Sequence, residues 1–181
     1  MSMQISFELS DRDLDFFRNA LKQSREAVRD ADENEIVEAI SDVLNEIRKN
    51  EPLPDFVSKR IPELESLISM LTDDEWQLPD KEREQLLATF VYFADPEDIL
   101  PDNIPVIGYL DDVIIIELVV RELHHVRVAY DDFCKFREDF EKKHGTDIDP
   151  VIRRDRLDRQ RQQLHQRMHR RTSRQKKSQI W

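Results

Sequence analysis

Apolar residues recur along most of the chain at steps of three and four, a spacing that places them on one face of an α-helix. The first such segment predicts a helix that begins at Ser10, where Ser10 and Asp13 approximate a capping box, and that ends near Ala31. Its apolar face consists of Leu14, Phe17, Leu21 and Val28.

Two further helices are predicted in the next forty or so residues. The first has Ile36, Ile40, Val43 and Ile47 on one face. It ends at Asn50, because the prolines at 52 and 54 cannot continue a helix. The second spans about residues 55–71, and Pro62 is expected to kink or split it. Its apolar positions are Val57, Ile61, Leu64, Ile68 and Leu71.

A fourth helix is expected after a polar connection at residues 76–80, where Pro79 fits the first helical turn. Its inner face consists of Leu86, Leu87, Phe90 and Val91. A proline-rich, acidic loop follows, and the longest periodic segment then predicts a fifth helix over residues 109–143. Such a helix is about 50 Å long, whereas a compact chain of this length has a radius of gyration near 16 Å. Its end is therefore expected to overhang, bend or pack on a partner.

The predicted fold is all-α: a helical bundle of about five helices with a long fifth helix and a basic C-terminal helix or tail. Gly145 is expected to end the fifth helix, and Pro150 opens the C-terminal segment. Two glycines in 181 residues agree with this, because hairpins and tight turns usually require more.

Composition also indicates the cellular compartment in which the protein is expected. The single cysteine, Cys134, cannot form an internal disulfide, and residues 1–10 lack the basic and apolar regions of a signal peptide. No stretch reaches the ~18 uninterrupted apolar residues of a membrane span. We therefore expect a cytoplasmic protein.

Charge divides the chain unevenly. Residues 151–181 contain eleven Lys and Arg against two Asp, a net +9, while residues 1–150 contain 17 against 37 acidic residues, a net −20. The predicted organisation is an acidic helical domain at 1–148 and a basic, partly helical tail at 149–181.

The segment 92–112 has a distinctive order of residues: aromatic residues, Pro96, the run Asp98-Ile99-Leu100-Pro101-Asp102, an Ile-Pro pair, Gly108 and the pair Asp111-Asp112. This order resembles the signature of the YkvA-like family over about residues 86–125, with a YkvA-like core at about 79–143. The resemblance implies a helical bacterial domain without an established activity. Many members look membrane-associated through apolar flanking helices, whereas this chain has charged residues in the corresponding region.

The same loop concentrates carboxylates that can be interpreted in two ways. Oxygen ligands crowded in this way suit Mg²⁺ or Ca²⁺ or a catalytic acid. Alternatively, they stabilise proline-containing turns and the first turn of the helix that follows. The pattern excludes an EF-hand, because Ile99 and Leu100 occupy its fifth and sixth positions. The candidate metal ligands are Asp95, Asp98, Asp102, Asp111 and Asp112.

Other catalytic patterns are weak. The sequence has no Gly-x-Ser-x-Gly elbow and no phosphate-binding glycine loop, and Cys134 is expected to be packed in a helix. Glu117, Arg121 and His124 share a predicted helix face, which favours a solvated or salt-bridged surface over a metal site. No catalytic residue and no cofactor are predicted, and an enzyme is the less favoured class.

The basic tail requires a partner, because its apolar line is sparse and a helix of this kind is marginal by itself. The line consists of Leu157, Leu164 and Met168. Three partners compete: nucleic-acid phosphates, an anionic membrane surface, and the acidic surface of this chain or of a second copy. The candidate binding residues are Arg153, Arg154, Arg156, Arg159, Arg161, Arg167, Arg170 and Arg171.

These observations favour a non-catalytic protein-protein interaction or regulatory module that binds a protein partner or forms a homo-oligomer. The alternative is a protein that binds RNA or DNA through the arginine-rich tail. A third hypothesis is a metal-dependent enzyme that uses the aspartate-rich loop.

Overall fold

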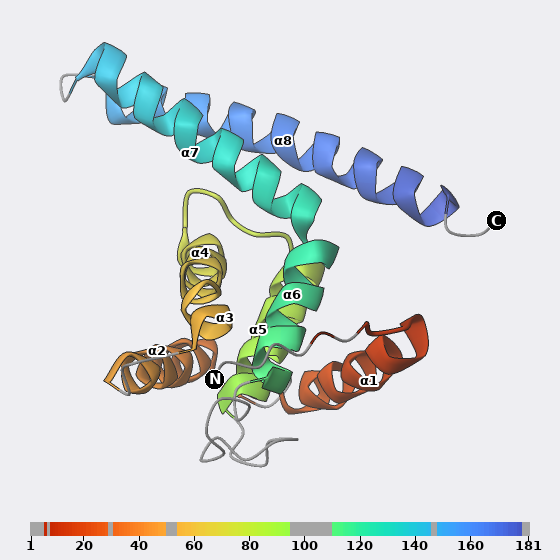
Figure 1. Ribbon diagram of the computed structural model, residues 1–181. Coiled ribbons are helices and arrows are strands. Elements are labelled where there is room, and N and C mark those ends of the chain that lie inside the picture. Colours follow the sequence, from red (N-terminus) through yellow and green to blue (C-terminus); the bar gives the residue numbers. More distant parts are fainter. Residues whose placement is uncertain are drawn as a thin grey trace. The chain divides into compact units, whose positions relative to one another are not determined.

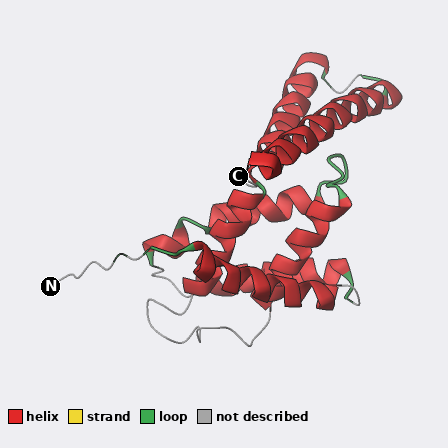
Figure 2. Ribbon diagram, turned by 90° about the vertical axis from the view of Figure 1, so that its right-hand side faces the viewer, coloured by secondary structure: helices red, strands yellow, loops and turns green. Residues whose placement is uncertain are grey.

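The structure is a computed structural model of the chain that describes residues 6, 8–28, 31–49, 54–94, 110–145 and 148–178. Within these residues all regular structure is helical, which confirms the predicted all-α class (Figure 2). The described helices are α1 (Asp11–Val28), α2 (Glu33–Lys49), α3 (Asp55–Ser58), α4 (Ile61–Thr72), α5 (Asp80–Ala94), α6 (Leu110–Glu122), α7 (His124–His144) and α8 (Pro150–Ser178) (Figure 1). None of the described helices combines the length and apolar character needed to cross a membrane.

The expected number of about five helices is too low, and the first reason is the segment around Pro62. A turn at Lys59 and Arg60 separates α3 from α4, and the Arg60 N–H bonds the Val57 carbonyl at 2.8 Å. Pro62 is the second residue of α4, where its missing N–H leaves no helical bond unmade. The predicted split therefore occurs, two residues before the proline.

The second reason is that the long fifth helix is interrupted. Leu123 separates α6 from α7 with φ −91° and ψ 9°, outside the helical range. Its side chain is 2% exposed, and its carbonyl accepts the N–H groups of Val126 and Arg127, both at 2.9 Å. The segment predicted as one fifth helix over 109–143 therefore forms two helices among the described residues, α6 and α7. Neither proline nor glycine occurs at this break, so no local signal marks it.

The chain divides into two compact units, each made of two stretches of sequence. Unit 1 comprises Met1–Pro62 and Glu84–Val119, and unit 2 comprises Glu63–Arg83 and Val120–Trp181. The predicted division into 1–148 and 149–181 stays a prediction.

Unit 1 is centred on the part of α5 that it contains. Leu86, Leu87, Ala88, Thr89 and Phe90 are consecutive and all buried, so this helix is covered on every side. The other helices contribute Leu21, Ile36, Ile40, Leu44, Ile115, Ile116, Leu118 and Val119. The predicted capping box is present at the start of α1, where the Ser10 N–H bonds Asp13 at 2.9 Å.

Unit 2 contains α7 and α8 side by side (Figures 1 and 2). Gly145, in the left-handed region at φ 63°, ends α7, as predicted. The C-terminal segment forms a long helix because its sparse apolar line is covered: Leu157, Leu164 and Met168 are all buried. The remaining core of unit 2 comes from Leu64, Leu67, Met70, Leu71, Trp76, Leu78, Val126, Ala129, Tyr130 and Phe133.

Candidate functional site

A tight turn after α4 organises the polar residues of unit 2. The Asp73 carboxylate accepts the N–H groups of Glu75 and Trp76, at 3.0 and 3.1 Å. Gln77 then adopts a left-handed conformation with φ 52°, an unusual backbone state for a residue other than glycine. This turn places Trp76 in the core and leaves Glu75 half-buried beside it.

Trp76 joins three parts of unit 2. Its ring lies 5.7 Å from that of Tyr130 and 5.4 Å from that of Phe133, both on α7. On the other side it meets His165 of α8 edge to face, with centroids 4.5 Å apart. Because Trp76 is fully buried, it anchors both long helices to the turn.

Glu75 is the centre of an ion-pair network that fixes α7 and α8 to the same turn. Arg137 of α7 contacts Glu75 at 3.0 Å and Asp73 at 2.9 Å. Arg153 of α8 also pairs with Glu75, and it reaches Glu141 of α7 at 2.6 Å. The hydrogen bond from Arg153 lowers the pKa of Glu75 against the opposing effect of burial. The carboxylate is therefore held ionised as a structural group.

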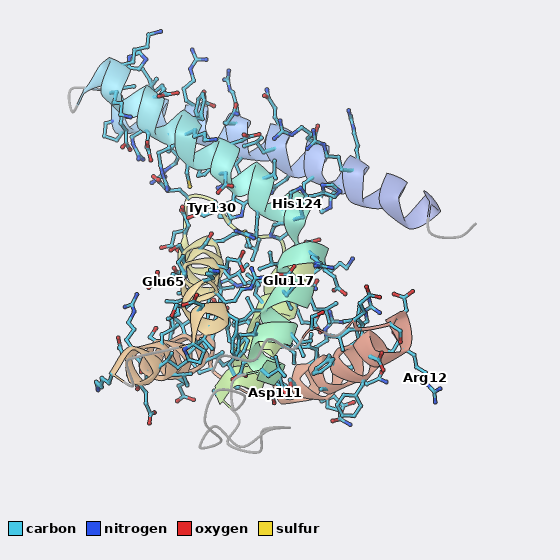
Figure 3. The ribbon with its side chains drawn as sticks, in the orientation of Figure 1. Arg12, Glu65, Asp111, Glu117, His124 and Tyr130 are labelled. Atoms are coloured by element: carbon cyan, nitrogen blue, oxygen red, sulfur yellow. The ribbon has the colours of Figure 1, made fainter. Side chains whose placement is uncertain are left out.

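The nearby nucleophiles and acids are held in unreactive forms. Burial raises the pKa of the Tyr130 phenol, whose hydroxyl donates to Asp73 at 3.2 Å and to the Ser69 carbonyl at 3.3 Å (Figure 3). Burial also raises the pKa of the Cys134 thiol, although Tyr130 and Arg137 oppose that change. A protonated phenol and a protonated thiol are poor nucleophiles at neutral pH.

His165 is also kept uncharged. Burial lowers its pKa to about 4, and the positive charge of Arg161 and the neighbouring His169 lower it further. Its Nε2 atom and the Trp76 Nε1 atom are both buried and have no hydrogen-bond partner among the described residues. At neutral pH this imidazole packs as a neutral ring.

The structure separates the eight predicted tail arginines into two groups. Arg153, Arg161 and Arg167 contact their own unit: Arg161 donates to the Glu75 carbonyl at 3.1 Å, and Arg167 pairs with Asp132. The other five are exposed on α8, namely Arg154, Arg156, Arg159, Arg170 and Arg171. Of these, Arg159 pairs with Asp155 on the same helix at 2.9 Å, and the other four form no ion pair within the described chain.

An open cleft of about 470 Å³ lies between the turn and the first part of α8. Its charges are mixed, because carboxylates and guanidinium groups alternate around it. The lining residues are Asp74, Glu75, Gln77, Pro150, Arg153, Arg154, Leu157, Asp158 and Arg161. Most of these charges already bind one another, which leaves no single charge sign to attract a ligand.

The predicted metal ligands are not brought together in the described residues. Asp95, Asp98 and Asp102 lie outside these residues. Asp111 is 2% exposed in the first turn of α6 and accepts a hydrogen bond from the Tyr92 hydroxyl at 3.4 Å (Figure 3). Asp112 follows it and is half-buried. No group of three potential metal ligands is found among the described residues, and the metal hypothesis stays a prediction.

The predicted face containing Glu117 and His124 does not exist as one continuous helix, because Leu123 ends it. Glu117 pairs with Arg60 at 2.7 Å, so the salt-bridged interpretation is confirmed for that residue. His124 begins α7 and lies beside His125, with ring centroids 5.5 Å apart.

The sequence interpretation missed the residues that organise unit 2. Residues 76–80 are not simply the predicted polar connection, because Trp76 and Leu78 are both buried. A signal was available in the order Asp73-Asp74-Glu75-Trp76, because an aspartate directly after a helix often forms a turn with the residues that follow. The partners Arg137 and His165 are 60 or more positions away, and no local pattern points to them.

Comparisons with known proteins locate one matching region. The model of a family described as "Protein of unknown function (DUF1232)" matches residues 85–118. These residues lie in the second stretch of unit 1 and inside the region of the predicted resemblance. No curated protein and no solved structure matches the chain. The polar network of unit 2 therefore lies outside the matched residues.

Proposed function

We propose that this protein is a non-catalytic protein-interaction or regulatory module of the cytoplasm. In this proposal unit 2 is a rigid helical platform, and the outward face of α8 binds a protein partner. We also propose that residues 85–118 form a YkvA-like core, since the matched region and the resemblance coincide.

The division of α8 into two faces carries the proposal. Its inward face is occupied by the buried Leu157, Leu164 and Met168 and by the ion pairs of Arg153 and Arg167. Its outward face has Ile152, Arg156, Arg159, Gln163, Gln166 and Arg170, all exposed and spaced by four and three residues. We call these six residues the basic stripe. Exposed arginines and glutamines along one helix face can donate hydrogen bonds to the carboxylates of a protein partner.

The chemistry of the buried residues supports a binding role over a catalytic one. Tyr130 and Cys134 are held protonated, and Glu75 is held by two arginines. These shifts move each pKa further from neutral pH, whereas a catalytic acid or base requires a pKa near the working pH.

A photoreactive amino acid at Gln163, in the middle of the basic stripe, tests this function. We expect discrete protein adducts of the full-length protein in cells after irradiation. The same label at Gln23, which is exposed on α1 and away from α8 in sequence, serves as the control. Loss of all adducts at Gln163, or adducts that disappear on nuclease treatment, would contradict a protein partner.

Nucleic-acid binding is the second candidate, because four exposed arginines of α8 form no ion pair within the described chain. Without the inward arginines the tail offers at most eight phosphate contacts, from the five outward arginines and from Arg174, Lys176 and Lys177. Counterion release then predicts a plot of log affinity against log salt with a slope no steeper than about −7 for duplex DNA. A gel-shift titration measures this slope, and a value near −10 would mean that the inward arginines also leave their carboxylates.

The third candidate is a metal-dependent enzyme, and calorimetry tests it. Its candidate ligands are Asp95, Asp98, Asp102, Asp111 and Asp112. Titration with Mg²⁺, Mn²⁺, Ca²⁺ and Zn²⁺ of the native chain and of Asp102→Asn/Asp112→Asn distinguishes it. Identical traces without heat of binding would remove it.

A further inference from the structure

The basic stripe is rich in hydrogen-bond donors suited to carboxylates. Arg156, Arg159 and Arg170 provide guanidinium groups, and the amides of Gln163 and Gln166 lie between them. All five side chains are exposed, and Arg159 makes only a local pair with Asp155. An acidic surface with the same helical spacing would satisfy every donor along the stripe.

The chain itself carries such a surface on α2. Glu35, Glu38, Asp42 and Glu46 follow one another at steps of three, four and four residues, and all are exposed. We call these four residues the acidic stripe. None of them forms an ion pair within the described chain. Their carboxylates therefore remain available to donors from another molecule.

The part of the basic stripe from Arg159 to Arg170 matches the acidic stripe in length. Arg159 and Arg170 are eleven residues apart on α8, and Glu35 and Glu46 are eleven residues apart on α2. At 1.5 Å per residue each separation is about 16 Å. When the helices lie side by side, the end arginines can each meet an end glutamate. The two glutamine amides then face Glu38 and Asp42.

From this match we infer that the basic stripe of one molecule binds the acidic stripe of a second copy. Every molecule carries both stripes, so each copy can offer either stripe to another copy. This inference rests on the proposed protein-interaction function and names the partner. The interface is charged and exposed, so it gives orientation and fast encounter more than high affinity.

Charge distribution favours a second copy over a polyanion. Unit 1, which carries the acidic stripe, contains 22 acidic residues against nine basic ones, a net −13. The acidic residues of unit 1 repel a nucleic acid, whereas in a second copy the same carboxylates are ligands for the basic stripe. The acidic charge that weakens binding of a nucleic acid therefore favours binding of a second copy.

Sedimentation velocity of the full-length protein tests the inference with two charge-reversed variants. One is Arg156→Glu/Arg159→Glu/Arg170→Glu, and the other is Glu35→Lys/Glu38→Lys/Asp42→Lys/Glu46→Lys, which reverses the whole acidic stripe. Each carries two stripes of like charge and should be monomeric. An equimolar mixture restores both opposite-charge contacts, so we expect it to associate about as strongly as the native chain. Raising the salt from about 0.05 to 0.5 M should weaken native association at least about tenfold.

The control matched to the arginine variant is Lys135→Glu/Lys142→Glu/Lys143→Glu. It makes the same change in net charge as that variant, at exposed positions of α7. It should associate as the native chain does, and circular dichroism should show native helicity for all variants. The inference is overturned if the native chain is monomeric at low salt, or if mixing restores nothing. It is also overturned if the arginine reversals abolish only the binding of added RNA. A monomeric native chain that still gives protein adducts at Gln163 removes the second copy as partner and leaves the proposed function intact.

Discussion

The two units use charge in opposite ways. Unit 1 has a net charge of −13 and a core built around one helix buried on every side, with acidic side chains on its surface. Unit 2 contains 19 basic and 17 acidic residues, a net +2, and pairs them between segments 60 or more positions apart, as in Arg137 with Asp73. The family match lies in unit 1, whereas the ion-pair network lies in unit 2. We conclude that apolar packing maintains the matched region, and that buried apolar residues and paired charges together fix the C-terminal helix in unit 2.

The largest expected effect separates the two cores. Trp76→Ala in unit 2 and Phe90→Ala in unit 1 each remove a fully buried ring and should each lower the free energy of unfolding by about 3–5 kcal/mol. Hydrogen exchange read by mass spectrometry should show lost protection mainly in the unit that carries the substitution. Equal loss of protection in both units after either substitution would show that the two units do not differ in stability and unfold together.

The next effect concerns the ion-pair network. Glu75→Gln weakens the partner shared by Arg137 and Arg153 and should lower the free energy of unfolding by about 1–2 kcal/mol, because the three groups are partly exposed to solvent. The control is Glu138→Gln, which breaks the exposed pair with Lys142 and should change stability by less than about 0.5 kcal/mol. Urea unfolding measures both values. Similar values would mean that the network adds nothing beyond ordinary surface pairs.

A tyrosine in each unit allows a matched comparison of hydrogen bonds. Tyr130→Phe removes a hydroxyl that contacts Asp73 at 3.2 Å and Ser69 at 3.3 Å, and should lower the free energy of unfolding by about 1.5 kcal/mol. Tyr92→Phe removes a hydroxyl whose contact with Asp111 is longer, 3.4 Å, and should lower it by less, about 0.5 kcal/mol. The order of the two values in thermal unfolding is the test. A larger effect at Tyr92 would place the stronger polar contact in unit 1.

The last effect is a pH dependence that arises in unit 2. His165 has an ordinary pKa of 6.5 and a folded-state pKa of about 4, so between these values the unfolded chain binds more protons than the folded one. Stability should therefore fall as the pH falls from 6.5 to about 4, by an amount on the order of 1 kcal/mol after allowing for solvent screening of a half-exposed ring. His165→Gln should flatten this part of the curve. An unchanged slope would assign the loss to other groups.

Much of the fold follows from local pattern. The stripes at three- and four-residue steps identified the helices, Ser10 and Asp13 marked the start of α1, and Gly145 marked the end of α7. These features depend on residues within a few positions of one another, so a single sequence contains them. The break at Leu123 is not predictable in this way. Its backbone leaves the helical range although no proline or glycine lies beside it.

The candidate site was predictable only in part. Sequence identified the eight arginines and their net charge but could not tell which face of α8 each would occupy relative to the rest of unit 2. Arg153 and Arg156 look equivalent in the sequence, yet the first pairs with Glu75 and Glu141 and the second is exposed.

Sequence by itself thus determined the helical class, most helix ends and the uneven distribution of charge, because propensity, capping and composition are local properties. Only the tertiary structure decided that Trp76 anchors two helices, that Glu75 binds two arginines, and that three of eight tail arginines face inward. The physical reason is that an ion pair or a ring contact depends on distance in space. Segments such as 73–76 and 137–165 are brought together by burial of apolar surface. The free energy of this burial depends on the area removed from water and not on the distance between the residues in the sequence, so the sequence alone does not show which segments meet.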